Sequence, residues 1–351
     1  MNWPDSSFLR MTGAPLPVIQ APMAGFGGVD LAVAAIRAGA VGSLPCALLD
    51  AEAVAAQVGS VRDHAEGPLN LNFFCHAMPD PAPDETAWQA LLEPYYLEYG
   101  VAPPTQSPRL RLPFDEAGCA VVEAFRPTMV SFHFGLPPAP LLTRVKACGA
   151  LVAASATSLA EGRWLVAHGA DIVIAQGAEA GGHSGWFLGD GPSGIGLMTL
   201  LPALVDVLDV PVVAAGGIMD GRAMAAAFAL GAQAVQLGTA LLLADEADTS
   251  VPHRQALASD AADGTRFTNL MSGRMARGIP NRLMRDLGDV RVEAPAFPYA
   301  AGALAPLRQA AEAMGRSDFT PLWAGQGARA ARPGAAADII AAIAADALSR
   351  L

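Results

Sequence analysis

The sequence predicts an α/β fold in which eight parallel strands close into a (β/α)8 TIM barrel, followed by an appended C-terminal helical subdomain. Three observations predict it. Eight short apolar runs recur along the first 243 residues. Amphipathic, alanine-rich stretches separate most of them, which is typical of strands covered by a layer of helices. Near-identical phrases also recur where the helices end, as a repeated βα unit leaves in a sequence.

The eight runs have the lengths of barrel strands. In chain order, the expected strands are Pro17–Met23, Ala40–Cys46, Pro68–Cys75, Met129–Gly135, Ala150–Ala156, Asp171–Gly177, Pro211–Gly217 and Ala234–Ala240. The helices expected between them include Gly28–Ala38, Asp50–His64, Ser158–His168 and Asp220–Leu230. Ser158 and Asp220 are placed as N-caps, and Gly169 and Gly231 follow the last helical turns. Eight such units favour a closed barrel over an open sheet.

Two segments interrupt this alternation. Residues 79–113 are rich in proline, acidic residues and tyrosine, and we expect them to form an insertion over the barrel mouth. After about Leu243 the strands are expected to stop. Residues 1–243 would then form the barrel. Residues 244–351 would form a helical subdomain packed on it, with an alanine-rich final helix from about Ala335.

Composition narrows the class of protein. The 351 residues are 52% hydrophobic and carry a formal net charge of −11, whereas a nucleic-acid-binding surface needs a basic face. The apolar runs are shorter than the roughly 20 residues that span a bilayer, and no signal peptide is evident. Four dispersed cysteines suit a reducing compartment. We therefore expect a cytoplasmic protein with neither nucleic-acid nor membrane partners. The oligomeric state is left open.

The chemistry of a TIM barrel belongs at the C-terminal ends of its strands. Here these positions carry amides, small hydroxyls and glycines, with Glu179 as the single carboxylate. The only lysine, Lys146, falls on a helix, which excludes a Schiff-base aldolase. The scarcity of acidic ligands argues against a metal. Amides and backbone N–H groups suit a planar ring with many acceptors and a phosphate tail, so a flavin such as FMN fits.

Two consecutive loops carry the features of a phosphate site. Gly216 and Gly217 follow the seventh strand and lead into a helix, and Gln236-Leu-Gly-Thr239 ends the eighth strand. Glycine frees backbone N–H groups to point at an anion, and these loops are the usual phosphate cradle of such barrels. A Gly-Gly pair alone is more often a turn. The second loop, which follows one βα unit later and adds a glycine and a threonine, favours a phosphate site over a simple turn.

The most informative stretch is Gln176–Gly185, which reads QGAEAGGHSG and contains one imidazole, His183. Histidine is the side chain best matched to proton transfer near neutral pH, so we expect His183 to be catalytic. His133, at the end of the fourth strand, is expected either to line the substrate site or to be a satisfied inner-barrel histidine. His76 follows Cys75 without a third ligand, which argues against a metal site.

Eight motifs resemble one known family. In order, QAPMAG, LNLNFFCH, VSFHFG, QGAEAGGHSG, AAGGI, QLGT, SGRMARGIPNR and LWAGQ are similar to motifs of the class I nitronate monooxygenases, formerly 2-nitropropane dioxygenases. The resemblance covers essentially the whole chain. It implies a flavoprotein with FMN and no metal. It also implies oxidation of alkyl nitronates, such as propionate 3-nitronate, by O2 to a carbonyl compound and nitrite.

The resemblance also implies roles for individual residues. The implied flavin-binding residues are Ala21, Pro22, Met23, Asn72, Gln176, Gly181, Gly217, Gln236, Gly238 and Thr239. Gly182 and Gly216, in the same glycine loops, are expected to bind the flavin with them. His183 would be catalytic, and Tyr299 would fill one of the tyrosine positions beside the substrate. His133 is the other residue considered as a substrate contact, from its position at a strand end. The lysine that the family places beside the substrate has no counterpart here. The candidates to replace it are Arg109, Arg254, Arg266 and Arg274.

Two other functions remain compatible with the residues. A related barrel could use NAD(P)H to reduce quinones or enoyl thioesters through FMN, and anaerobic mixing with NADH would separate this reading from the first. The other is a flavin-binding barrel without enzymatic activity. The presence of His183 in a loop of small residues argues against a barrel without enzymatic activity.

Overall fold

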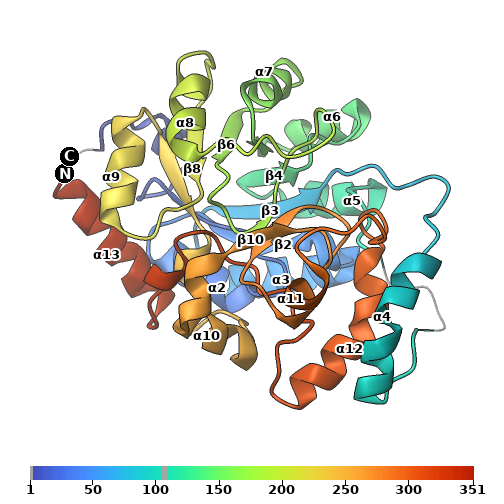
Figure 1. Ribbon diagram of the computed structural model, residues 1–351. Helices are drawn as coiled ribbons and strands as arrows, with labels where there is room; N and C mark the ends of the chain where they lie inside the picture. The colour runs from blue at the N-terminus through green and yellow to red at the C-terminus, as the bar shows by residue number, and fades with distance from the viewer. Residues whose placement is uncertain (1–2, 105–109) are drawn as a thin grey trace.

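The computed structural model describes residues 3–104 and 110–351, and it contains an eight-stranded parallel barrel (Figure 1). Its strands are β1 (Val18–Gln20), β2 (Gly42–Pro45), β3 (Leu69–Phe74), β4 (Met129–His133), β5 (Leu151–Ala156), β6 (Ile172–Gln176), β8 (Val212–Ala215) and β9 (Ala234–Leu237). The sheet order is β1-β9-β8-β6-β5-β4-β3-β2. A bridge between Ile19 and Val41 joins the first strand to the second. The predicted TIM barrel and all eight expected strands are confirmed.

Helices cover the outside of the barrel, as the alternation predicts. They include α2 (Val29–Arg37), α3 (Ala51–His64), α5 (Glu116–Phe125), α6 (Ala139–Ala147), α7 (Leu159–Ala167), α8 (Leu197–Val205) and α9 (Gly221–Ala229). The side chains of Ser158 and Asp220 cap α7 and α9 by accepting backbone N–H groups. Gly169 and Gly231 adopt φ of +103° and +96°, which suits residues that follow a helix. The expected caps are therefore confirmed.

The barrel interior is closed at its N-terminal end. Phe8, on α1 (Ser7–Thr12), is fully buried and packs with inward-facing side chains such as Ile19, Met129 and Ile174. An aromatic plug at this end leaves the opposite end, where the strands finish, as the place for a site.

The eighth position of the helical layer is filled by α13 (Ala336–Leu348), far along the chain from β9. Its buried residues Ile340, Ile343 and Ala347 belong to the same core cluster as the barrel strands. It lies beside α9 and also contacts α2 (Figure 1). The division of the chain into residues 1–243 and 244–351 stays a prediction, but this last helix packs as part of the barrel wall.

The segment after the barrel contains strands that the sequence did not predict. β10 (Arg266–Thr268) and β11 (Ala276–Gly278) pair antiparallel, and β11 also pairs with β7 (Gly182–His183). The prediction that strands stop after Leu243 is therefore wrong. These strands are only two or three residues long, too short to show a period, and β11 pairs with β7 across about 90 residues of sequence.

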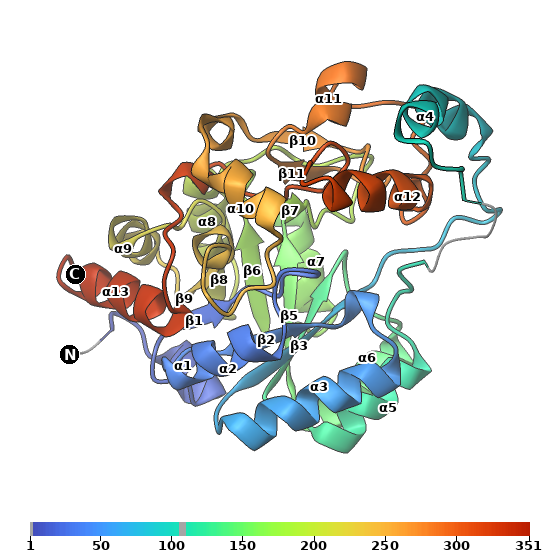
Figure 2. The ribbon, with the colours of Figure 1, turned by 90° about the horizontal axis from the view of Figure 1, so that it is seen from below.

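The remaining helices lie at the end of the barrel where β7 and β11 lie (Figure 2). They are α4 (Thr86–Tyr99), α10 (Val251–Ala258), α11 (Arg282–Leu287) and α12 (Ala300–Ala313). Helices α4, α11 and α12 share a second core, and α10 packs separately from them. Trp88 on α4 is fully buried in this second core and donates its indole N–H to the carbonyl of Ala300. None of the helices formed by the described residues is long and apolar enough to cross a bilayer.

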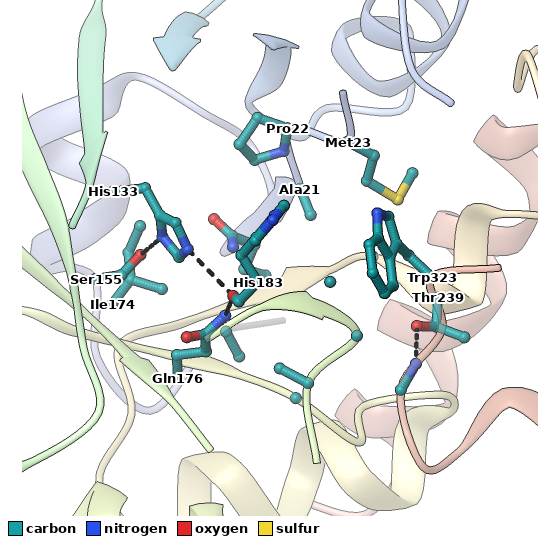
Figure 3. A pocket seen from close by; sticks show the side chains of 18 of the residues that line it. Ala21, Pro22, Met23, His133, Ser155, Ile174, Gln176, His183, Thr239 and Trp323 are labelled. Atoms are coloured by element: carbon teal, nitrogen blue, oxygen red, sulfur yellow. Dashed lines mark hydrogen bonds between the residues drawn. The ribbon is translucent and has the colours of Figure 1, made fainter. Parts of the chain in front are cut away.

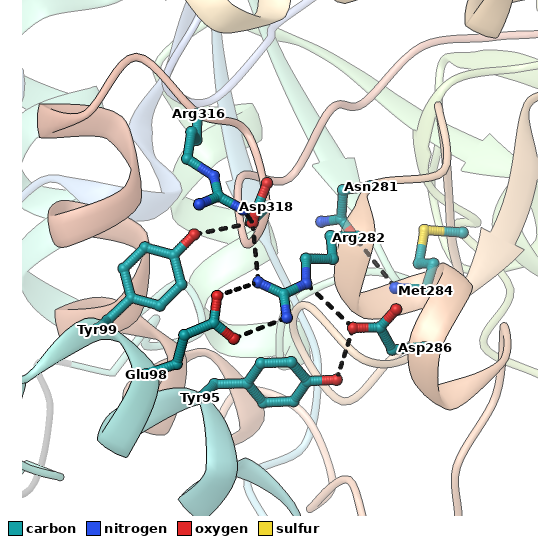
Figure 4. A network of polar contacts seen from close by, with 9 residues as sticks. All are labelled: Tyr95, Glu98, Tyr99, Asn281, Arg282, Met284, Asp286, Arg316 and Asp318. Carbon is teal, nitrogen blue, oxygen red and sulfur yellow. Dashed lines mark hydrogen bonds and ion pairs between the residues drawn. The ribbon is translucent and has the colours of Figure 1, made fainter.

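A polar network also joins α4 to α11 (Figure 4). Arg282 forms two 2.7 Å hydrogen bonds with the carboxylate of Glu98 and pairs with Asp286 and Asp318. Tyr95 donates its hydroxyl to Asp286. The bidentate geometry fixes orientation as well as contact, so the inserted segment 79–113 is attached to the segment after the barrel.

Candidate active site

One cavity opens at the C-terminal ends of the barrel strands and brings the predicted site residues together (Figure 3). Fourteen of the fifteen line it: Ala21, Pro22, Met23, Asn72, His133, Gln176, Gly181, Gly182, His183, Gly216, Gly217, Gln236, Gly238 and Thr239. Tyr299 is not among the described residues that line this cavity. Phe297, two residues earlier, places its ring 5.4 Å from that of His183.

His183 is held by its backbone from several directions. Its carbonyl accepts hydrogen bonds from Nε2 of His133 at 3.1 Å and from Nε2 of Gln176 at 3.0 Å (Figure 3). Gln176 also accepts the N–H of Gly185, and His183 pairs with Ala276 across β7 and β11. The imidazole therefore stands on a fixed support. Both His133 and Gln176, as the structure shows them, position this loop.

The side chain of His183 has a defined partner on one nitrogen. Its Nε2 lies 2.8 Å from the hydroxyl of Ser272, and that hydroxyl lies 3.2 Å from the carbonyl of Arg274. Both contacts are satisfied when Nε2–H donates to Ser272 and Ser272 donates onward. In this arrangement Nδ1 carries the lone pair. It forms no hydrogen bond with any described residue and is not fully buried, and the side chain lines the cavity. His183 is thus built to accept a proton.

Aromatic rings surround this imidazole. The rings of Phe74 and Phe134 lie 6.1 Å from it, and that of Trp323 lies 5.7 Å away. Burial lowers the pKa of His183 well below 6.5, and the positive charge of Arg111 lowers it further. The imidazole is therefore neutral at pH 7, the form in which it can act as a base.

Three further histidines are neutral for the same reason, and they predict how stability changes with pH. Burial lowers the pKa of His76, His133 and His253 to about 4. Between pH 6.5 and 4 the unfolded chain therefore binds more protons than the folded one, and stability falls as the pH is lowered. Each group contributes up to about 1.4 kcal/mol per pH unit, so we expect a loss of roughly 4 kcal/mol per unit near pH 5.

Denaturant unfolding at a series of pH values from 7 to 5 would measure this slope. His253→Gln should remove about a third of the roughly 4 kcal/mol per unit that these three histidines contribute. An unfolding free energy that is constant over this range would contradict the prediction.

The loops after β8 and β9 have the backbone expected of an anion site. Gly216 and Gly217 adopt φ of +112° and +72°, a region that side chains rarely enter. Thr239 accepts the N–H of Gly325 at 2.9 Å (Figure 3). A Cβ on Gly181 would lie 2.5 Å from the nitrogen of Gly325, so only glycine allows these two backbones to meet. The resulting surface presents main chain to the cavity.

The amides at the strand ends differ in what they still offer a ligand. Asn72 donates to the carbonyl and hydroxyl of Ser131, and both ends of the Gln176 amide are engaged within the protein. The buried Oε1 of Gln236 has no partner among the described residues. An unpaired buried acceptor is costly, so this amide fits a ligand with N–H or O–H groups.

The two acidic residues near the cavity serve the scaffold. Glu179, the carboxylate that the sequence places at a strand end, accepts the N–H of Leu197 at the start of α8. The buried Glu161 accepts from Thr157, Phe187 and Leu188 and so fixes the loop after β7. Within the described residues, no group of three or more His, Cys, Asp or Glu is arranged to hold a metal ion.

Three of the four arginines considered as replacements for the missing lysine, Arg254, Arg266 and Arg274, are not among the described residues that line the cavity. Arg254 donates to backbone carbonyls that include those of Leu243 and Thr249, and Arg266 pairs with Asp289. Arg274 lies 4.1 Å from the ring centres of both Phe134 and Trp186. Arg109 falls outside the described residues.

Sequence reasoning missed several residues that shape the site. Arg111, Phe297, Ser272, Trp323 and Gly325 all line the cavity or contact His183. Ser272, Trp323 and Gly325 lie inside the SGRMARGIPNR and LWAGQ motifs, so the signal was present without an assigned role. Arg111 lies in the inserted segment, where no motif marked it.

Comparison with known proteins supports the chemistry of this cavity. The family model described as "Nitronate monooxygenase" matches residues 7–346. The chain belongs to the nitronate monooxygenase family. It is therefore an oxidoreductase that acts on nitronates. Proteins named nitronate monooxygenase from Pseudomonas aeruginosa and Paraburkholderia phytofirmans are 42% and 40% identical to it. The alignments cover 95% of this chain in both cases, and 96% and 93% of the relatives.

Solved structures agree with this placement. A nitroalkane oxidase from Streptomyces ansochromogenes is 36% identical, with a TM-score of 0.87 over 97% of this chain and 98% of that one. FabK from Thermotoga maritima has a TM-score of 0.74 over 98% and 96% of the two chains, but at 24% identity it shows only the shared barrel fold. The expected resemblance to nitronate monooxygenases is thus confirmed.

Proposed function

We propose that this nitronate monooxygenase uses FMN and O2 to oxidise alkyl nitronates of the propionate 3-nitronate type to a carbonyl compound and nitrite. The observation that carries the proposal is the pairing of two features in one cavity. A neutral imidazole, His183, faces it with a free nitrogen, and main-chain loops free of side chains line it beside Thr239.

FMN fits the residues present. The phosphate would lie at the loops of Gly216–Gly217 and Gly238–Thr239, where backbone N–H groups are accessible. Gln236 would bind the ring or ribityl chain through its unpartnered Oε1, and Ala21 to Met23 would pack against the ring. Bound FMN would supply the two-electron redox chemistry that no side chain in the cavity provides.

His183 acts as the base when the substrate is a neutral nitroalkane. Its Nδ1 takes the proton from the carbon next to the nitro group, and Ser272 holds Nε2–H so that the correct nitrogen is free. The imidazolium formed then stabilises the nitronate anion. A preformed nitronate needs no deprotonation, so His183 contributes less to its turnover.

The purified protein should therefore be yellow. Heat should release a cofactor with the absorbance of FMN and without that of adenine, and ethyl nitronate should cause oxygen uptake with release of nitrite. Anaerobic NADH should leave the flavin oxidised on the timescale of turnover, which separates this function from an NAD(P)H-dependent reductase. A colourless protein that does not take up added FMN would overturn the proposal.

A further inference from the structure

Arg111 is the one charged side chain, histidines aside, among the described residues that line the active-site cavity. Its guanidinium forms no ion pair or side-chain hydrogen bond with any described residue, in contrast to Arg254, Arg266 and Arg274. None of the carboxylates in the described part of the chain lines the cavity beside it. Burial lowers the pKa of Arg111 to about 10, which leaves it cationic at neutral pH. A half-buried, unpaired positive charge is costly unless an anion completes it.

The backbone at Arg111 is held in place. Nε2 of His76 donates to the carbonyl of Arg111 at 3.1 Å, and three residues later the N–H of Phe114 donates to the carbonyl of Phe74 at the end of β3. His76 packs its ring 4.7 Å from that of Phe297. The inserted segment is therefore fixed to the barrel at the point where Arg111 enters the cavity.

The guanidinium lies on the side of the cavity that holds His183. Its carbon is 5.9 Å from the ring centre of Phe297, and the same ring is 5.4 Å from His183. In the view of Figure 3, Trp323 lies between His183 and Thr239, the residue of the proposed phosphate loop. Arg111 is thus within reach of a substrate whose reacting carbon lies at His183.

We infer that Arg111 is the anion-binding residue of the substrate subsite and that it selects nitronates whose carbon chain ends in a carboxylate. The guanidinium would hold the distal carboxylate while the nitronate group lies against His183. Arg111 would supply the positive charge that the missing lysine would otherwise bring to the substrate, but from a different segment of the chain. This assignment rests on the proposed function, because it names the substrate class of the same cavity.

The test compares the selectivity and the binding of matched ligands. Selectivity is the ratio of kcat/KM for propionate 3-nitronate to kcat/KM for propyl 1-nitronate, which lacks the carboxylate. Binding is measured by calorimetry with succinate, which has the shape and charge of propionate 3-nitronate, and with butyrate as its monoanionic counterpart. Arg111→Gln should lower both the ratio and the affinity for succinate by about 10–100-fold, the value of a charge-assisted hydrogen bond.

Control variants separate the charge from its position. Arg111→Lys should keep most of the succinate preference, and Arg266→Gln, which removes an exposed arginine elsewhere, should leave ratio and affinity unchanged. Arg111→Met, which keeps the packing on Phe297, replaces the glutamine variant if that protein does not fold.

Each outcome has one meaning. Equal losses on both nitronates would show that Arg111 binds the nitronate group and would overturn the inference, as would an unchanged ratio and succinate affinity. Succinate binding that depends on Arg111 without turnover of any nitronate would support the subsite and overturn the proposed function.

Discussion

Replacing His183 with asparagine is expected to lower the turnover of neutral nitroalkanes by about 10²–10⁴-fold, the contribution of a well-placed general base. The imidazole is neutral, and its Nδ1 faces the cavity while Ser272 binds Nε2. Asparagine keeps a hydrogen-bonding group of similar reach but cannot take a proton. Turnover of preformed nitronates should fall much less, because their carbon has already lost its proton.

The measurement is kcat/KM for nitroethane and for ethyl nitronate with the same variant, together with its FMN content. FMN content should hardly change, because His183 lies outside the proposed phosphate loops. Its backbone is held by His133 and Gln176, and these contacts remain in the variant. Ser272→Ala serves as a second variant, because it releases Nε2 while keeping the imidazole. Equal losses on both substrates would refute the base role, and no loss on either would place His183 outside the chemistry.

Gly217→Asp is expected to weaken FMN binding by roughly 10³-fold. A carboxylate at this loop would meet the cofactor phosphate, and two charges about 4 Å apart repel by roughly 4 kcal/mol at an effective dielectric of 20. Gly217 has φ of +72°, and a Cβ there would lie 3.4 Å from the Cβ of Glu179. Part of the effect would therefore be backbone strain and crowding, which are independent of charge.

Gly217→Asn isolates the charge, because asparagine has the same shape and tolerates this backbone conformation about as well. The ratio of the FMN dissociation constants of the two variants, measured by fluorescence quenching, reports the phosphate. Thermal unfolding of the two apoproteins would control for repulsion between the new aspartate and Glu179. Similar dissociation constants for both variants would mean that the phosphate lies elsewhere.

The parts of the fold that the sequence predicts are those governed by local physics. The eight strands are buried on both faces and appear as continuous apolar runs, and the caps at Ser158 and Asp220 follow from the chemistry of side-chain acceptors. His183 stood out because glycines surround it. Most of the other predicted cavity residues could be recognised because they lie at, or shortly after, the C-terminal end of a predicted strand.

The residues that were missed depend on contacts distant in sequence. Ser272 reaches His183 through the pairing of β11 with β7, and Arg111 reaches the cavity because His76 holds its carbonyl. Neither pairing leaves a periodic pattern in the chain. The resemblance placed Tyr299 at the substrate, whereas the ring next to His183 belongs to Phe297. The role of Tyr299, directly before α12, stays a prediction.

The position of α13 has a consequence for how the chain folds. The eighth strand ends at Leu237, but the helix that completes the wall beside it begins at Ala336. The residues between these two elements form one long insertion, and both of its ends are attached to the barrel. Its closure entropy grows only slowly with length, but the contacts it creates have high contact order and form late. The barrel wall is therefore complete only after the last helix of the chain has packed against α9 and α2. We expect that truncating the chain before Ala336 exposes the buried faces of both helices and destabilises the whole barrel.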